Sequence, residues 1–262
     1  MYVPHAETNP EKRGVLNIAR KRDDVSWGTY LRHGIGTRLS ILGERSSQQW
    51  LIYNPLIFAQ FHVIARESAP GVIRSLDEAF PWMTSMADVG AGTGAFSAEA
   101  KRRGHTVMAC EHSRVARLFA RLQGVRAHPF DLSRVDPIQL QGRPRACGPF
   151  DLAICLEVGE HLLPELGDRL VRLLSELSST VVFSAASPGQ GGIGHINEQS
   201  KEYWLTRFED RSLCFQGELT DQLKRGFATH GAAQFLIDNV MVLQRASDDD
   251  ASRCGHRASR PH

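Results

Sequence analysis

Residues Ala87–Ser113 of this chain read ADVGAGTGAFSAEAKRRGHTVMACEHS, and this stretch decides the fold. A short apolar run ends in Asp88, and the glycine-rich turn Gly90–Gly94 follows it. A helical run then leads through Gly104 to a second apolar run, which ends in Glu111. The order of strand, tight turn, helix and strand predicts one β-α-β unit.

The glycine-rich turn indicates a site for a nucleoside cofactor. Glycine has no Cβ atom, so the backbone can bend sharply there and come close to a ligand. The helix that follows directs its free N–H groups and its positive dipole end toward whatever lies above the turn. An acid at the end of the second strand, here Glu111, is placed to hold a ribose diol.

Two further acids bear on which cofactor binds. Residues Gly90–Ala95 satisfy the loose dinucleotide pattern G-x-G-x-x-G/A, so the turn alone leaves a nicotinamide or flavin cofactor open. Asp88, however, lies two residues before the first glycine, where a carboxylate would repel a pyrophosphate and suits a cationic amino or sulfonium group. Asp131 and Leu132 follow a third short strand-like run, and Asp131 is placed to accept a hydrogen bond from an adenine amino group.

At these residues the chain resembles the class I S-adenosylmethionine-dependent methyltransferases, over roughly residues 83–244. The resemblance rests on D-x-G-x-G-x-G at Asp88–Gly94 and on acids that end the second and third strands. It implies that S-adenosylmethionine lies with its amino end near Asp88, its ribose diol on Glu111 and its adenine near Asp131. The expected cofactor-binding residues are Asp88, Gly90, Gly92, Gly94, Glu111, Asp131 and Leu132.

Strand-like and helix-like runs continue to alternate after Glu111. The strand-like runs cover residues 125–130, 150–156, 180–185, 213–216 and 235–244. The helix-like runs cover residues 113–123, 162–177 and 198–210. This alternation predicts a mostly parallel sheet with helices on both faces, and the resemblance implies that the last two strands form a reversed hairpin. We therefore expect an α/β fold, a Rossmann-like seven-stranded sheet with an N-terminal helical extension.

The first 80 residues predict a partly helical extension. Residues 46–67 have a helical pattern with a break at Pro55, and residues 70–80 read as a second helix. Aromatic residues of this part, Tyr53 among them, are expected to pack on the core rather than to bind substrate. In the resembled families such extensions often form a lid. The predicted division is an extension over 1–80, a methyltransferase domain over 81–246 and a disordered tail over 247–262.

Charge, apolar segments and cysteine spacing give no sign of a membrane-spanning, secreted or cysteine-based metal-binding protein. A net charge of +2 over 262 residues is too small to indicate a nucleic-acid or membrane partner by itself. The first residues lack an apolar signal-peptide core, and the longest apolar stretch, Trp50–Ala65, is interrupted and too short to span a bilayer. The five cysteines have no C-x-x-C spacing, which favours buried reduced thiols. We expect a cytoplasmic protein; the sequence gives no prediction of its oligomeric state.

The chemistry is expected just after two neighbouring strands, because ligands in open α/β sheets bind outside the carboxyl ends of the strands. The segment Glu157–His161, with the spacing E-x-x-E-H, follows the strand over 150–156. If it opens a helix, Glu157, Glu160 and His161 share one face, and His195 could join them from the glycine-rich loop after the next strand. Two carboxylates and two imidazoles suit a divalent cation such as Mg²⁺, Mn²⁺ or Zn²⁺, which would lower the pKa of a bound hydroxyl.

The spacing E-x-x-E-H resembles that of two families that carry metal there, the small-RNA 3′-end 2′-O-methyltransferases and the ubiquinone-pathway O-methyltransferases. The same acids are also favoured at a helix start without metal, and Glu157 or His161 would then be a simple general base. The expected catalytic residues are Glu157, His161 and His195. The expected metal ligands are Glu157, Glu160, His161 and His195.

Four further segments resemble a bacterial group of methyltransferases that share no firm common acceptor. They are Cys155–His161, Phe183–Gly192, His195–Gln199 and Tyr203-Trp204. We expect O- or N-methylation of a small-molecule or natural-product acceptor. The alternatives are a metal-assisted RNA 2′-O-methyltransferase, since dispersed arginines leave a nucleic-acid acceptor open, and a nicotinamide-dependent oxidoreductase.

Overall fold

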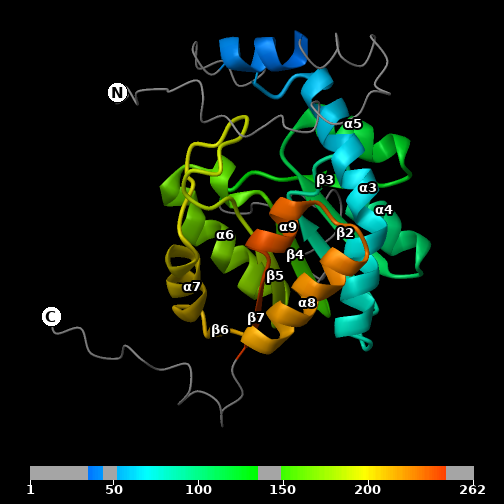
Figure 1. The fold of residues 1–262 in the computed structure, drawn as a ribbon, viewed down its shortest axis with the longest axis vertical. Helices are drawn as coiled ribbons and strands as arrows, with labels where there is room; N and C mark the ends of the chain where they lie inside the picture. The colour runs from blue at the N-terminus through cyan, green and yellow to red at the C-terminus, as the bar shows by residue number, and fades with distance from the viewer. Residues whose placement is uncertain (1–34, 44–51, 135–148, 246–262) are drawn as a thin grey trace, which may run out of the picture.

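The computed structural model describes residues 35–43, 52–134 and 149–245, which form one seven-stranded sheet covered by helices (Figure 1). The strand order is β3-β2-β1-β4-β5-β7-β6. Strands β1 to β5 are parallel to one another, and β7 is antiparallel to both β5 and β6, so β6 points the same way as the first five. The strands are β1 (Ser85–Val89), β2 (Thr106–Glu111), β3 (Ala127–Pro129), β4 (Leu152–Leu156), β5 (Thr180–Ser184), β6 (Leu213–Phe215) and β7 (Met241–Arg245). The expected Rossmann-like α/β fold with an N-terminal helical part is confirmed.

The order of the strands reverses at β1, and this reversal positions the site. β1 pairs with β2 on one side and with β4 on the other, and Asp88 lies opposite both Ala109 and Ile154. The connections after β1 and β4 therefore leave the sheet in opposite directions, and ligands of open α/β sheets bind outside the carboxyl ends of the strands at such a point. The glycine-rich turn and the segment after β4 both lie there.

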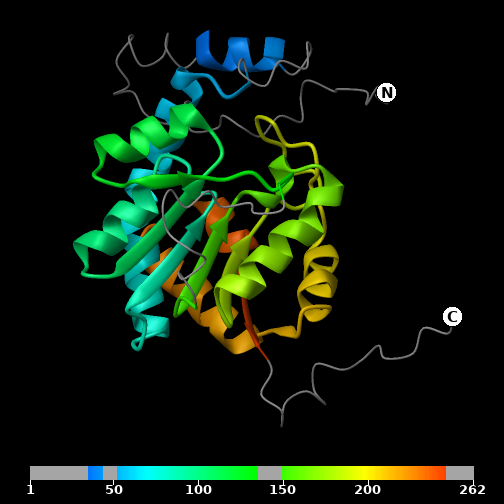
Figure 2. The ribbon, with the colours of Figure 1, turned by 180° about the vertical axis from the view of Figure 1, so that it is seen from behind.

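Helices cover both faces of the sheet (Figures 1 and 2). The core on one face joins the strands to α6 (Pro164–Leu177) and α7 (Lys201–Glu209), with Phe183 packed between Trp204 and Phe208. Burying side chains of this size contributes about 1.5–3 kcal/mol each. The core on the other face joins the strands to α3 (Pro55–Ala79), α4 (Ala95–Arg102), α8 (Gly217–Thr229) and α9 (Gln234–Asn239). The short helix α5 (Arg114–Leu122) packs Ala120 against Ala109 of β2.

Helix α3 differs from its prediction as two helices. It starts at Pro55, because Asn54 caps it, and it runs without a break through Pro70. The helix buries one face along both of its halves. The free energy gained by this burial exceeds the cost of the backbone hydrogen bond that Pro70 cannot make. The second half supplies Val72 and Leu76 to the same core as the sheet. The domain division at residue 80 stays a prediction.

The structure corrects the sequence reading in three other places. Residues 35–43 are helical where no pattern was found, and α8 was not predicted. The strand predicted over 235–244 is instead α9 followed by β7, because an apolar run of this length does not distinguish a buried helix from a strand. The predicted tail over 247–262 lies outside the described residues.

Helix 35–43 is tied to the start of α3. Ser40 donates its hydroxyl to the Ile52 carbonyl at 2.6 Å, and the Asn54 amide donates to the Gly36 carbonyl at 3.2 Å. Figures 1 and 2 both place this helix (dark blue) at the end of the molecule where the loop after β5 (yellow) lies. The helix over 35–43 therefore lies at the end of the sheet at which the site is expected.

Two further expectations can be compared with the described ranges. No helix within them has the length and apolar character needed to cross a bilayer. Cys110 and Cys155 are free and buried. Cys214 is disulfide-bonded instead, so the expectation of reduced thiols is wrong at that position.

Candidate functional site

The glycine-rich turn uses its three glycines in two different ways. All three have positive φ, at 79° for Gly90, 53° for Gly92 and 76° for Gly94. A Cβ atom on Gly90 would lie 2.4 Å from a Val158 methyl group, and one on Gly94 would lie 2.8 Å from the Ala120 Cβ atom. A Cβ atom on Gly92 would meet nothing within 4 Å. Gly90 and Gly94 therefore allow close packing, whereas Gly92 faces the open space above the turn.

Glu111 ties the end of β2 to this turn. Its carboxylate is buried and accepts hydrogen bonds from the Gly92 N–H at 2.8 Å and from the Ser113 N–H at 2.6 Å. Burial raises the pKa of Glu111, and the two N–H donors oppose that shift. Each carboxylate oxygen keeps a further lone pair for a diol. The contact with the cofactor ribose stays a prediction.

Asp88 is a buried acid beneath the turn. The Ser97 hydroxyl of α4 donates to its carboxylate at 2.6 Å. Burial, together with repulsion from Glu111, raises the pKa of Asp88 to about 7. A cation placed beside Asp88 would favour its charged form, as an amino or sulfonium group would do.

Asp131 and Leu132 behave differently from each other. Asp131 is half-buried and accepts hydrogen bonds from the Ser133 N–H and hydroxyl and from Arg134, and these hydrogen bonds lower its pKa. Leu132 is buried in the core on the α6 face, and its carbonyl accepts from Arg169 at 2.9 Å. Both residues follow β3 as expected, and their contacts with an adenine ring stay predictions.

The N-terminal extension reaches the glycine-rich turn through a histidine that the sequence analysis did not single out. His62 of α3 places its Nδ1 atom 3.2 Å from the Thr93 hydroxyl, between Gly92 and Gly94. Gln123, at the end of α5, hydrogen-bonds the Thr93 carbonyl. The turn is therefore held from both sides.

The segment after β4 does not open a helix, so the predicted shared face is wrong. Glu157 has a left-handed backbone with φ 55°, a single 3₁₀ turn covers Gly159–His161, and α6 begins only at Pro164. The left-handed backbone leads the Glu157 side chain to Asn239, and Glu157 is not among the three residues that converge, although its carboxyl still lies beside that of Glu160. The Glu157 carboxylate accepts from the Asn239 amide at 3.1 and 3.3 Å.

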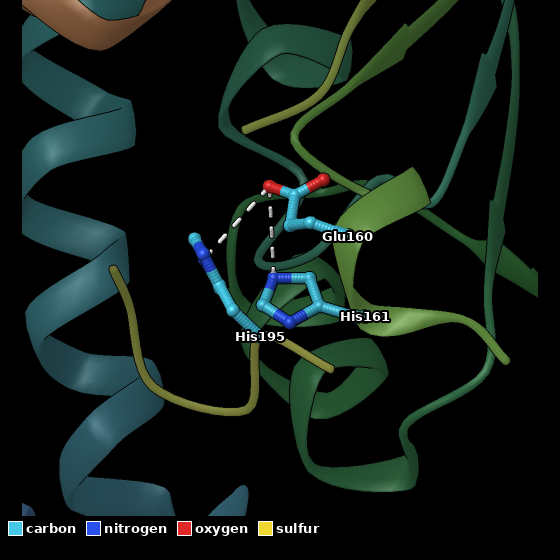
Figure 3. A group of neighbouring side chains, drawn as sticks. All are labelled: Glu160, His161 and His195. Carbon is cyan, nitrogen blue, oxygen red and sulfur yellow. Dashed lines mark ion pairs between the residues drawn. The ribbon is translucent and has the colours of Figure 1, made fainter. Parts of the chain in front are cut away.

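The other three predicted ligands do come together (Figure 3). Glu160 is completely buried, and its Oε1 atom lies 4.0 Å from His161 Nε2 and 3.9 Å from His195 Nε2. The two imidazole centroids are 4.9 Å apart. Neither carboxylate oxygen of Glu160 makes a hydrogen bond of good geometry among the described residues, although the N–H groups of Glu160 and Ala186 and the Glu157 carboxyl lie near it. An unpaired buried carboxylate is costly, so its position facing two imidazoles calls for a functional reason.

The Nδ1 atoms of both histidines, the ring nitrogens on the side away from Nε2, also have oxygen partners. His195 Nδ1 lies 2.8 Å from a Glu198 carboxylate oxygen, and His161 Nδ1 lies 3.1 Å from the Gly194 carbonyl. A proton on each Nδ1 atom leaves both Nε2 lone pairs facing Glu160. Metal-binding histidines usually donate their other ring N–H to a carboxylate or carbonyl oxygen in this way. One carboxylate and two imidazoles therefore fit a divalent cation such as Zn²⁺ or Mn²⁺.

Burial keeps His161 in its neutral form and makes Glu160 hard to ionise. Burial, with repulsion from His195, lowers the pKa of His161 to about 4. Burial and the neighbouring Glu157 charge raise the pKa of Glu160 well above its usual range. A neutral His161 at physiological pH can act as a ligand or as a base.

Sequence reasoning missed two partners of this cluster. Glu198 follows His195 at a spacing of three residues, and this H-x-x-E spacing was the available signal. Tyr53 reaches His161 from the extension, and its sequence position before the helix cap gave no such signal.

A reversed strand order, a glycine-rich turn and acids at or just after the ends of β1, β2 and β3 are together the features of the S-adenosylmethionine-dependent methyltransferases. Residues 87–181 match the family model described as a methyltransferase domain. This stretch runs from within β1 to the start of β5 and includes Glu111, Asp131 and the segment after β4. The chain is accordingly an S-adenosylmethionine-dependent methyltransferase, and the nicotinamide-dependent alternative is set aside.

Solved structures share the fold at low sequence identity. A sugar N-methyltransferase from Streptoalloteichus has 19% identity and a TM-score of 0.50, covering 69% of this chain and 88% of its own. A TehB-like methyltransferase from Corynebacterium glutamicum has 17% identity and a TM-score of 0.51, covering 74% and 100%. An O-methyltransferase family protein from Burkholderia thailandensis has 14% identity and a TM-score of 0.52, covering 85% and 69%. No curated protein matches the chain.

Proposed function

We propose that this enzyme transfers the methyl group of S-adenosylmethionine to a hydroxyl or amino group of a small-molecule acceptor, assisted by a divalent cation. The observation that carries the proposal is the unpaired, fully buried Glu160 carboxylate between two imidazole Nε2 atoms. The fold shared with a sugar N-methyltransferase supports an acceptor of this size.

The cofactor fits the turn at the end of β1. Gly92 leaves open space above the backbone, and the N-terminus of α4 offers N–H groups to a carboxylate. Asp88 and Glu111 supply acids for the amino end and the ribose diol. S-adenosylmethionine brings the activated methyl group, and the chain has to orient the acceptor and exclude water.

Glu160, His161 and His195 would hold the cation. A bound cation lowers the pKa of an acceptor hydroxyl and fixes its oxygen in line with the methyl group. Glu157 is not a ligand in this proposal, because it bonds Asn239. Its buried carboxylate, with the pKa raised by burial, is placed to take the acceptor proton. If no cation binds, His161 takes that role.

The first test measures the cation directly. Wild-type protein should bind Zn²⁺ or Mn²⁺ in calorimetry with one site, and Glu160→Gln should lose that binding. The same variant should unfold at a higher urea concentration than metal-free wild type, because it removes an unpaired buried carboxylate. Glu209→Gln, on the exposed end of α7, is the matched control for both measurements.

The second test identifies the acceptor. Radiolabelled methyl transfer should be followed over amino sugars, phenols and a short RNA with a free 3′ end, with and without EDTA. Transfer to a small molecule that EDTA abolishes and Mn²⁺ restores supports the proposal. Transfer to the RNA alone would replace the proposed acceptor, and transfer unaffected by EDTA would leave His161 as a simple base.

A further inference from the structure

Thr93 is the residue by which two distant helices hold the glycine-rich turn. It stands between two glycines with left-handed backbones, and only 4% of it is exposed. Its hydroxyl lies 3.2 Å from His62 Nδ1 of α3, and its carbonyl accepts from the Gln123 amide at the end of α5. The hydroxyl and the carbonyl of this one residue are therefore both held from outside the turn.

His62 comes from a helix that is anchored at both ends. Helix α3 begins at a buried cap, Asn54, and its second half is buried in the core of the sheet. The His62 ring packs on Phe119 of α5, with ring centroids 6.0 Å apart. The imidazole is therefore presented to the turn in a defined position.

The contact between His62 and Thr93 needs no charge. Burial, with repulsion from Arg66, lowers the pKa of His62, so the ring is neutral at physiological pH. A hydroxyl can both donate and accept, so Thr93 can bond the neutral ring in either tautomer. The contact therefore persists whichever ring nitrogen carries the proton.

The turn needs such a contact, because its glycines have little conformational preference of their own. Glycine adopts left-handed and right-handed backbones about equally readily, and all three glycines of the turn have positive φ. Gly90 and Gly94 lie against neighbouring side chains, whereas Gly92 has open space above it. Gly92 is also the glycine over which we place the cofactor. Holding Thr93 from outside therefore restricts the backbone beside the glycine that matters most for binding.

We infer that His62 is a positioning residue for the cofactor, which acts through Thr93 on the shape of the glycine-rich turn. A turn that is already held in its binding shape loses less conformational entropy when the cofactor binds, so the affinity is higher. The family model matches residues 87–181, so His62 adds to the cofactor site from outside the matched stretch. The inference rests on the cofactor position in the proposed function and is independent of the cation.

Calorimetric titration of the full chain with S-adenosylhomocysteine at neutral pH tests the inference. His62→Leu keeps an apolar side chain against Phe119 and should bind about threefold to tenfold more weakly than wild type, the range that one neutral hydrogen bond sets. His62→Asn keeps a polar atom at the position of Nδ1 and should recover most of the affinity. Val63→Ala, at the next position and 54% exposed, is the matched control. Wild-type affinity in a folded His62→Leu protein, or equal losses in His62→Leu and His62→Asn, overturns the inference.

A double-mutant cycle separates this role from a direct contact between His62 and the cofactor. Thr93→Val removes the hydroxyl and keeps the branched shape, so it should also weaken binding. His62→Leu combined with Thr93→Val should bind no more weakly than Thr93→Val alone, because both changes remove one contact. Losses that multiply would assign His62 to the cofactor itself and overturn the inference. If His62→Leu does not fold, Thr93→Val compared with Thr93→Ser, which keeps the hydroxyl, repeats the test.

Hydrogen exchange of the cofactor-free protein provides a second measurement. The amides of residues 87–95 should exchange about threefold to tenfold faster in His62→Leu than in wild type, whereas those of β4 should be unchanged. Equal exchange in the turn overturns the inference and leaves the proposed function standing. Wild-type protein that binds no S-adenosylhomocysteine would instead refute the cofactor position, and the inference with it.

Discussion

Replacing Glu111 tests how one buried acid serves both the fold and the cofactor. In Glu111→Ala the Gly92 and Ser113 N–H groups lose their carboxylate acceptor. The Gly92 N–H lies in the turn that borders the open space above β1, so its orientation should relax. The variant also removes the acid that we assign to the ribose diol.

The magnitude follows from these contacts. A hydrogen bond to a charged group contributes about 1.5–3 kcal/mol, so loss of the diol contact alone should weaken cofactor binding by about 10- to 150-fold. Two backbone N–H groups are left without their acceptor, which lowers the free energy of unfolding. Removing a buried carboxylate with a raised pKa restores part of that free energy. The expected net loss in the free energy of unfolding is about 1–3 kcal/mol. Glu111→Gln should lie between wild type and Glu111→Ala, because its amide oxygen can still accept one N–H.

The measurements are calorimetric titration with S-adenosylhomocysteine and urea unfolding followed by circular dichroism. The product is used so that no turnover complicates the titration. Glu209→Ala serves as a control for the loss of an exposed acid. Wild-type affinity in a folded Glu111→Ala protein would refute the assignment of Glu111 to the cofactor. An affinity loss confined to conditions that unfold the variant would assign Glu111 to the turn alone.

The other predictions concern the turn, Asp88 and the loop after β5. Gly92→Ala should stay folded, at a cost of about 1 kcal/mol for its left-handed backbone, and should bind S-adenosylhomocysteine poorly. Gly90→Ala should instead lower the urea midpoint, because its Cβ atom meets Val158. Because the folded pKa of Asp88, about 7, lies above the unfolded value of 3.8, the free energy of unfolding should fall as pH rises from about 4 to about 7, by up to about 4 kcal/mol from this group. Urea unfolding at pH 5 and pH 8 should show a smaller difference for Asp88→Asn, and an unchanged difference would contradict the raised pKa. Glu198→Gln should weaken Zn²⁺ binding by about 10-fold or more, since the His195 Nδ1 atom loses its carboxylate partner, and equal binding by calorimetry would argue against that outer contact.

The sequence by itself determined the cofactor half of the molecule. The turn, the helix and the two strands of Ala87–Ser113 are contiguous, so their periodicity predicts the β-α-β unit without knowledge of distant contacts. Asp88 and Glu111 are placed by their positions at strand ends, and the structure has them there. The antiparallel pairing of the last two strands followed from resemblance, because no local pattern specifies which strands pair.

Only the tertiary structure decided which of the predicted site residues come together. Spacing treated Glu157 and Glu160 as equivalent, but a left-handed backbone at Glu157 sends one acid to Asn239 and leaves the other facing two histidines. Local periodicity assumes a regular backbone and therefore cannot foresee such a residue. The meeting of Tyr53 with His161 likewise joins residues 108 positions apart. Contacts of that kind depend on how helices pack against the sheet, which no short stretch of sequence encodes.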